Sequence, residues 1–255
     1  MIRREERLPD GALQWVLLAQ KDHAHLAGEL AAQWGADPFA PLVPEEDVVL
    51  AAHHHDDGWP DWDRAPKLDP QDGRPLTFTE VPLQDVLAIW RNSIQHASEY
   101  GALPAWLVAA HFSALLRHSQ EADHPDSLCW LSKYDQLMGN WLRAWQEEDP
   151  EESTEPLAHR GFEQLQMFDR ISLWFCCAER SEAFTLPTPA GPELTITPQG
   201  EDRFTLAPWP LRVDTLTLEI TGLALPADDY RGRWPKPLES AAERSYRWQL
   251  MPEQS

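Results

Sequence analysis

Cysteine is scarce in this chain of 255 residues, which contains only Cys129, Cys176 and Cys177. Because two of the three are adjacent, the sequence offers neither a disulfide framework nor the spaced cysteine pairs of a zinc knuckle. Such scarcity is typical of proteins that stay in a reducing compartment. We therefore expect a cytoplasmic protein that folds around a hydrophobic core without covalent cross-links.

Long apolar runs are also missing. No signal-like apolar block follows residues 1–7, and no run approaches the roughly 20 apolar residues that span a bilayer. Secretion and membrane insertion are therefore not expected.

Positive charge is scarce as well, since 21 basic side chains face 42 acidic ones and leave a formal net charge of -21. Most of the acidic excess lies in residues 1–181. Such a charge repels nucleic-acid phosphates and anionic lipids, so neither nucleic acid nor a membrane is an expected partner. It attracts cations, although solubility alone explains it equally well.

Hydrophobic periodicity predicts mostly helices in the first two thirds of the chain. A short strand is predicted over residues 12–19, followed by a helix from Asp22 to Trp34. A second helix begins at Pro44 with an acidic first turn, as the helix dipole favours, and ends before Gly58. After a connection rich in Pro, Asp and Gly, further helices are predicted over residues 82–99, 104–119, 126–147 and 156–180.

The pattern beyond Pro187 changes to alternation of apolar and polar residues, which predicts short strands. These strands cover residues 194–197, 204–206 and 216–220. We thus expect a mainly α fold, α+β overall, with a helical domain over residues 1–181 and a small β-rich C-terminal extension over residues 182–255 packed on it.

The C-terminal extension carries no residue pattern of reaction chemistry. It could serve as a lid, as the interface of a homodimer, or as a cap over the last helix. Its tryptophans, Trp209, Trp234 and Trp248, are predicted to be packing residues.

The most informative segment is Ala52–Trp59, in which three histidines precede two aspartates. His55 and Asp56 stand side by side at the end of an apolar helical run. A neutral imidazole beside a carboxylate forms a natural clamp for a divalent metal ion. Because an unpaired carboxylate near a core is costly, the pair predicts a bound cation.

Three further polar residues, His23, His111 and Asp169, lie on apolar helical stripes. Asp169 is the clearest case, because Leu165 and Leu173 flank it at i-4 and i+4. A single histidine on such a face is more often a core residue bonded to a carbonyl group. The combination of all these residues is what indicates a metal site.

Their order resembles the ligand arrangement of the HD-domain metallohydrolases: one His on an early helix, a His-Asp pair on the next, and an Asp on a late helix. A closer similarity is to the domain-of-unknown-function 3891 family. Five segments in the same order carry it: Gln20–Gly28, His55–Trp59, Leu68–Pro75, Ala110–Phe112 and Phe168–Leu173.

The HD resemblance implies an HD-like helical bundle that binds one or two divalent ions. The ion would be Mg or a transition metal such as Fe, Mn, Ni, Co or Zn. Its implied ligands, here called the four proposed ligands, are His23, His55, Asp56 and Asp169. Asp56 would also orient a metal-activated water molecule.

Other histidines have less certain roles. His111 would either ligate a second ion or act as a general acid facing the substrate. His25, His53 and His54 are rivals for the ligand positions. His54 points roughly 100° away from His55 on a helix, so we expect it at the surface or behind the ligands.

The connection after the His-Asp pair is well placed to cover a pocket. Trp59 and Trp62 would offer stacking surfaces, while Arg64, Lys67 and Arg74 would bind an anionic small-molecule substrate. Salt bridges within a solvated loop explain these three bases about as well.

Three functional hypotheses follow. The first is a metal-dependent phosphohydrolase that acts on a small phosphorylated molecule or nucleotide through a metal-activated water. The second is an HD-type diiron oxygenase, which needs six protein ligands, with candidates at His96, His111 and His118. The third is a non-catalytic module in which the metal supports the core and the loop recruits a partner.

Overall fold

A seven-stranded sheet includes segments from both ends of the chain. The computed structural model describes residues 1–177 and 182–253, and its strand order is β1-β2-β6-β7-β5-β4-β3. Every neighbouring pair is antiparallel except β5 and β7, which are parallel. The strands are β1 (Ile2–Arg7), β2 (Leu13–Leu18), β3 (Phe184–Leu186), β4 (Leu194–Pro198), β5 (Arg203–Ala207), β6 (Leu216–Pro226) and β7 (Ala242–Pro252).

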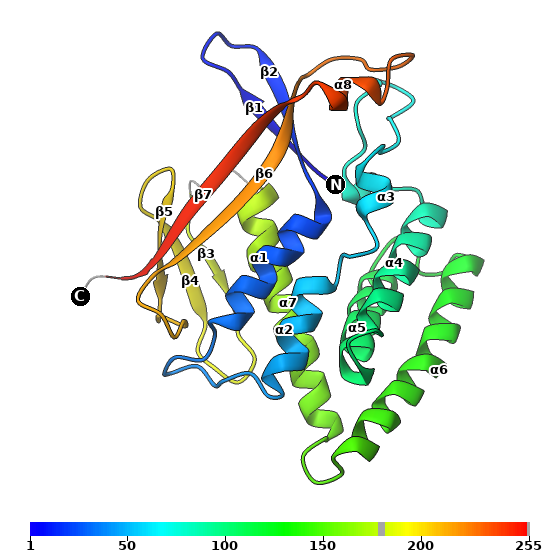
Figure 1. Ribbon diagram of the computed structural model, residues 1–255, viewed down its shortest axis with the longest axis vertical. Helices are drawn as coiled ribbons and strands as arrows, with labels where there is room; N and C mark the ends of the chain where they lie inside the picture. The colour runs from blue at the N-terminus through cyan, green and yellow to red at the C-terminus, as the bar shows by residue number, and fades with distance from the viewer. Residues whose placement is uncertain (178–181, 254–255) are drawn as a thin grey trace.

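The expected helical bundle with a small β extension is therefore wrong, because the sheet is a large curled half-barrel. Figure 1 shows the long strands β6 and β7 running side by side, from near α8 to the end at which β5 lies. The strand predicted over residues 12–19 is confirmed as β2, but it pairs with β6, from Gln14 opposite Pro226 to Leu17 opposite Leu223. This long-range pairing joins the first strands to the C-terminal ones.

The predicted long helices are confirmed within a few residues at each end. The final residues of the helix predicted over 156–180 lie outside the described part of the chain. The helices are α1 (Gln20–Ala32), α2 (Glu45–His54), α3 (Pro60–Asp63), α4 (Leu83–Ala97), α5 (Ala102–Arg117), α6 (Pro125–Glu148), α7 (Glu155–Cys177) and α8 (Lys236–Glu239), with a 3-10 turn, η1, at Phe78–Glu80.

Helices α1 and α7 lie between the sheet and the remaining helices, with α6 on the far side (Figure 1). Helices α1, α2, α5 and α7 pack against one another and form the centre of the helical layer. Gly161 on α7 permits this close approach, because a Cβ there would lie 3.2 Å from a methyl group of Leu107 and 3.3 Å from one of Val48.

One hydrophobic core runs through the sheet and the helices. Phe175 of α7 contacts the rings of Phe204 and Trp248 at centroid distances of 5.1 and 5.2 Å. Trp248 is thus a packing residue, as predicted, and Trp209 is partly buried against the same core. Trp234 packs in a smaller cluster with Tyr230. The division of the chain near residue 181 stays a prediction, but this core crosses it.

Two local features place the site. Ala19 alone separates β2 from α1, so the first turn of α1 is fixed by the sheet. Gly58 lies in the turn after α2, where a Cβ would come within 2.2 Å of the carbonyl oxygen of Ile89 on α4. The turn can approach α4 closely only because residue 58 has no side chain.

Among the described residues, no helix combines the length and apolar character that crossing a bilayer requires.

Candidate metal centre

Four helices bring five predicted site residues to one place. His23 lies in the first turn of α1, His55 and Asp56 follow the last turn of α2, His111 lies on α5, and Asp169 lies on α7. All five are buried, with 1% to 8% of their surface exposed. Burial of so many titratable groups requires compensation by partners within the cluster.

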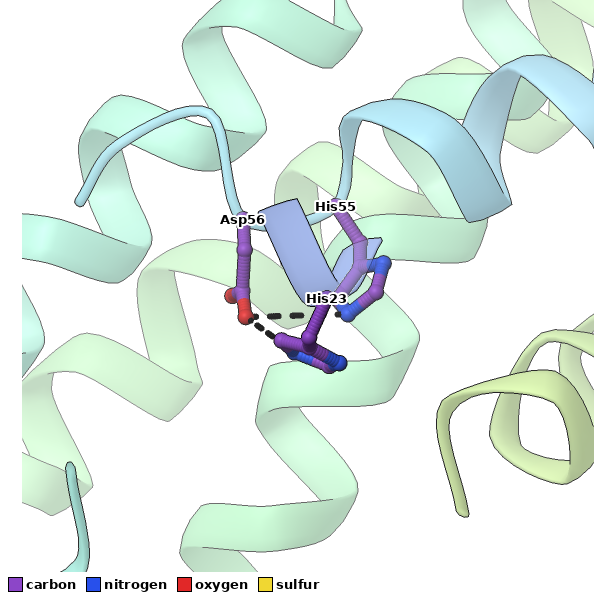
Figure 2. Close-up of side chains that lie close together, drawn as sticks. All are labelled: His23, His55 and Asp56. Atoms are coloured by element: carbon purple, nitrogen blue, oxygen red, sulfur yellow. Dashed lines mark hydrogen bonds and ion pairs between the residues drawn. The ribbon is translucent and has the colours of Figure 1, made fainter. Parts of the chain in front are cut away.

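The four proposed ligands converge at short range. Asp56 Oδ2 lies 2.9 Å from His23 Nε2 and 3.7 Å from His55 Nε2. Dashed lines mark both pairs in Figure 2. Asp169 Oδ1 lies 3.4 Å from His55 Nε2 and 3.8 Å from His23 Nε2. Ligand bonds of about 2.1 Å to one ion place neighbouring ligand atoms about 3.0–3.5 Å apart. Two overlapping groups have all their ligand atoms within 4.8 Å of one another and could each hold an ion: His23, His55 and Asp56 form the first, and His55, His111 and Asp169 form the second.

Hydrogen bonds to groups outside the cluster hold three of the four proposed ligands, His23, His55 and Asp56. His23 Nδ1 donates to Ser172 Oγ at 2.9 Å, and that hydroxyl donates to the backbone oxygen of Asp169. His55 Nδ1 donates to the backbone oxygen of Ala52 at 2.9 Å. Trp59 Nε1 donates to Asp56 Oδ1 at 2.9 Å. Such bonds fix the tautomer and orientation of metal ligands in proteins.

These bonds leave the electron pairs of the cluster facing one another. With the hydrogens of His23 and His55 on Nδ1, each neutral imidazole presents an unshared pair at Nε2 to carboxylate oxygens. His55 Nε2 is buried and has no hydrogen-bond partner within residues 1–177 and 182–253. Two imidazoles and two carboxylates in this arrangement need a proton or a metal ion between them.

Without a metal ion, the charges in the cluster favour a proton on His55. Burial by itself lowers the pKa of His55, but the carboxylates of Asp56 and Asp169 outweigh burial and raise this pKa to about 9. Burial raises the pKa of each carboxyl group, and the neighbouring histidines more than reverse it, so both carboxyl pKa values lie below their usual range. Both aspartates are therefore charged at neutral pH.

His111 lies at the edge of the cluster, with Nε2 4.0 Å from Asp169 Oδ2. Together with His55 and Asp169 it forms a second, overlapping group that could hold an ion. Burial lowers the pKa of His111 to about 4. A general acid must hold a proton near neutral pH, so this neutral imidazole is better suited to ligate an ion or accept a hydrogen bond.

Two hollows meet at the cluster. One is a small, partly open cavity of about 110 Å³, and the other is a more open groove of about 460 Å³. The groove runs between α5, α7 and residues 187–189. His111, Leu115 and Asp169 line both hollows. The cluster therefore has solvent access through the groove.

The three rival histidines stay outside the cluster. His25 is 63% exposed, and its ring lies 4.8 Å from that of His53. His54 bonds to Asp57 Oδ2 at 2.7 Å and stacks on Tyr100, so its predicted place away from the ligands agrees with the structure.

The three bases predicted to bind substrate are paired with acids. Arg64 pairs with Asp61, Lys67 pairs with Asp85, and Arg74 pairs with Asp72 and Glu80. None of the three lines either hollow beside the cluster. The structure gives their predicted role in substrate binding no support.

The two tryptophans of the same connection differ. Trp59 is 2% exposed and lines the small cavity, and its indole nitrogen also donates a hydrogen bond to the proposed ligand Asp56. Trp62 lies beneath the ammonium group of Lys67, 5.9 Å from it, and lines neither hollow beside the cluster.

Sequence reasoning missed two polar residues beside the ligands. Ser172, which holds His23, lies three residues after Asp169 and therefore on the same face of α7. Gln20, which lines the small cavity, lies three residues before His23 on α1. In both cases, the sequence feature that could have identified the residue was a polar side chain one helical turn from a predicted ligand.

The fold and the site define a protein with a curled sheet, a helical layer and a buried His/Asp cluster that could hold a metal ion. The model of the DUF3891 family, described as a protein of unknown function, matches residues 1–227. The chain belongs to this family, as its five segments predicted. No curated protein and no solved structure matches the chain.

Proposed function

We propose that this chain is a metal-dependent hydrolase, akin to the HD-domain phosphohydrolases, whose four proposed ligands hold one divalent ion. The observation that carries the proposal is the convergence of four ligand atoms, from His23, His55, Asp56 and Asp169, with neighbouring pairs 2.9 to 3.8 Å apart. Two imidazole nitrogens favour a transition metal over Mg²⁺. When bound, such an ion activates water and polarises a substrate oxygen.

The number of converging groups favours a hydrolase over a diiron oxygenase. The oxygenase hypothesis requires six protein ligands, whereas five His and Asp side chains meet in the described cluster. Its other two candidates, His96 and His118, are exposed, and His118 Nδ1 bonds to the backbone oxygen of Ala114. A single ion therefore suits the donor set better than two.

The remaining atoms of the cluster assign roles to the chain's own residues. Asp56 uses Oδ1 for Trp59 and Oδ2 for the ion, so it has little capacity left to orient water. Asp169 Oδ2 and His111 Nε2 lie 4.0 Å apart where the groove reaches the cluster. Asp169 Oδ2 would accept a hydrogen bond from the attacking water, and His111 Nε2 would accept one when its ring hydrogen is on Nδ1.

The proposed substrate is a small phosphoester that enters through the groove. Water attacks the phosphorus atom, the ester P–O bond breaks, and the alcohol leaves with a proton. Arg170 lines the groove beside Asp169 and makes no ion pair with any described residue. It is better placed to bind an anionic substrate than the paired bases of residues 64–74.

Metal content tests the site directly. Untagged protein purified with added Mn²⁺, Co²⁺, Ni²⁺ or Zn²⁺ should retain about one ion per chain, measured by elemental analysis. Asp169→Asn should lose the ion, because the amide is a much weaker ligand than the carboxylate. His54→Ala is the matched control, since this histidine precedes His55 but points elsewhere. Equal metal retention by Asp169→Asn would exclude the assignment.

Turnover tests the reaction class. Hydrolysis of p-nitrophenyl phosphate and of nucleoside monophosphates should require the added ion, and Asp169→Asn should abolish it. A protein that retains the ion but hydrolyses no phosphoester would rule out the phosphohydrolase. Oxygen consumption with about two irons per chain would instead establish the oxygenase.

A further inference from the structure

We infer that the small cavity beside the ligands is a subsite for a small uncharged group with a hydroxyl or N–H, which Gln20 recognises. This inference rests on the proposed function, because the group would belong to the substrate of the same site. It names the part of the substrate that determines specificity.

The size and the walls of the cavity limit what can enter. Its volume of about 110 Å³ has room for roughly four non-hydrogen atoms, at the ~30 Å³ that a water molecule occupies. Most of its walls are aromatic or aliphatic, formed by Trp59, Phe78, Val86, Trp90, Phe112, Leu115 and Leu173. Such walls favour a compact, largely apolar group.

Gln20 supplies a polar atom that lacks a partner. Its side chain lines the cavity and is 3% exposed, and its Oε1 is buried with no hydrogen-bond partner within the described chain. A buried amide oxygen without a partner is costly, so it is well suited to accept a hydrogen bond from a bound group. The backbone of Gln20 is fixed, because its N–H donates to Asp63 Oδ2 at 2.9 Å.

The charges around the cavity exclude an anion. Its lining includes the carboxylates of Asp56 and Asp169 but neither lysine nor arginine, as far as the chain is described. A divalent ion on the four proposed ligands would balance these two charges. A phosphate inside the cavity would then add buried negative charge without compensation.

The open groove differs from the cavity because a cation, Arg170, lines it together with the carboxylates of Glu163 and Asp169. Leu115 lines both the groove and the cavity. The substrate would therefore lie across the ion, with its anionic group towards Arg170 and its neutral group towards Gln20. Substitution of Arg170 should therefore weaken binding of the anionic group only, and substitution of Gln20 should weaken binding of the neutral group only.

Two probes of equal size separate these contributions. Acetamide and acetate each have four non-hydrogen atoms, but only acetamide is uncharged and carries an N–H. Their dissociation constants for the Zn²⁺-loaded protein are measured by NMR titration. Gln20→Leu should weaken acetamide binding about five-fold or more, by loss of one hydrogen bond, and leave acetate binding within two-fold.

The matched control is Gln164→Leu. Gln164 is 1% exposed and also has a buried Oε1 without a partner among the described residues, but it does not line the cavity. This variant should bind acetamide like the parent. Val86→Phe, which fills the cavity, should prevent acetamide binding even if Gln20→Leu fails to fold.

A third probe tests the groove. Arg170→Gln should weaken the binding of inorganic phosphate about five-fold and leave acetamide unaffected, whereas Gln20→Leu should leave phosphate unaffected. Equal acetamide affinity in the parent, Gln20→Leu and Val86→Phe proteins, with metal content unchanged, would overturn the subsite. Loss of metal from the parent protein would instead overturn the proposed function.

Discussion

The ligand side chains of the candidate metal centre depend on the residues that hold them from behind. Ser172 fixes the ring of His23, the Ala52 carbonyl fixes His55, and the Trp59 indole fixes Asp56. The residues that orient the ligands thus come from α7, from α2 and from the turn after α2. This arrangement makes the neighbours of the ligands as testable as the ligands themselves.

Ser172→Ala should lower metal affinity about 10- to 100-fold, because His23 loses the bond that fixes its ring and tautomer. Isothermal titration with Zn²⁺ measures the change. Ser113→Ala is the matched control, since Ser113 is equally buried but its hydroxyl has no hydrogen-bond partner in the described structure. Equal losses of affinity in both variants would mean that general packing, not ligand orientation, sets the affinity.

The pH dependence of stability should reverse when a metal ion binds. The pKa of His55 is raised from 6.5 to about 9 in the fold, against burial and by the charges of Asp56 and Asp169. In metal-free protein this stabilisation is fully present below pH 6.5 and is lost as pH rises through 9. A metal ion requires the deprotonated ring, so loaded protein gains stability over the same window.

Thermal unfolding between pH 6.5 and 9 tests this reversal. The midpoint temperature of unfolding should fall with increasing pH in EDTA, and it should rise with increasing pH in the presence of Zn²⁺. His111 does not interfere, because its lowered pKa of about 4 affects stability only below pH 6.5. Parallel curves in the two conditions would show that no ion displaces the proton of His55.

The ligands themselves could be predicted from sequence, whereas their surroundings could not. His23, His55, Asp56 and Asp169 stand out as polar groups on apolar helical faces, where burial needs a partner. Arg64, Lys67 and Arg74 also suggested a function, but their acidic partners are set by loop conformation, which sequence spacing does not specify. The sequence therefore showed that basic residues are present in this loop, but it did not show which residues they contact.

At the scale of elements, the turn between α2 and α3 depends on its packing against α4. Gly58 N donates to Ser93 Oγ at 3.0 Å, and a Cβ on Gly58 would approach Ser93 N to 2.5 Å. Because these neighbours include backbone atoms, they cannot move without shifting α4. The position of His55 and Asp56 follows from this contact.

Gly58→Ala should therefore destabilise the protein by about 1–3 kcal/mol, the usual cost of overpacking. It should also weaken metal binding, since the adjacent ligands shift. Gly139→Ala on α6 is the control. A Cβ added at this position would have no neighbour within 4 Å, and alanine is more favourable than glycine in a helix by up to about 1 kcal/mol. Denaturant unfolding compares them, and a Gly58→Ala protein as stable as the control would contradict the packing argument.

The helices were predicted well because their apolar residues recur with a helical period over two turns or more. The sheet was not, for reasons visible in two strands. β1 is mostly charged and has no apolar period, whereas β7 alternates polar residues with Tyr246, Trp248 and Leu250, a strand pattern that the prediction overlooked. Neither strand forms an apolar run, and the pairing of β2 with β6 depends on segments about 200 residues apart, which no local pattern specifies.

At the scale of the whole molecule, the shared core makes the two ends of the chain interdependent. Val16 and Leu18 of β2 belong to the same hydrophobic cluster as Phe204 and Trp248. Residues on both sides of position 181 therefore bury one another. The predicted domain division can be tested by cutting the chain there.

A fragment of residues 1–181 should not fold cooperatively, because β2 loses β6 and Phe175 loses its aromatic cover. The full chain should unfold in one transition. Circular dichroism melts of both proteins make the comparison, and near-ultraviolet signals report tertiary packing. A fragment with a sharp transition and retained metal would establish residues 1–181 as an independent domain.

The single residue between β2 and α1 has a mechanical consequence. Strand β2, which is paired on both sides, leads through one residue into the helical turn that carries His23, so the sheet positions this imidazole. An arriving ion would meet a ready-made coordination shell rather than assemble one. The speed of metal loading should then be governed by passage along the groove, not by rearrangement of the protein.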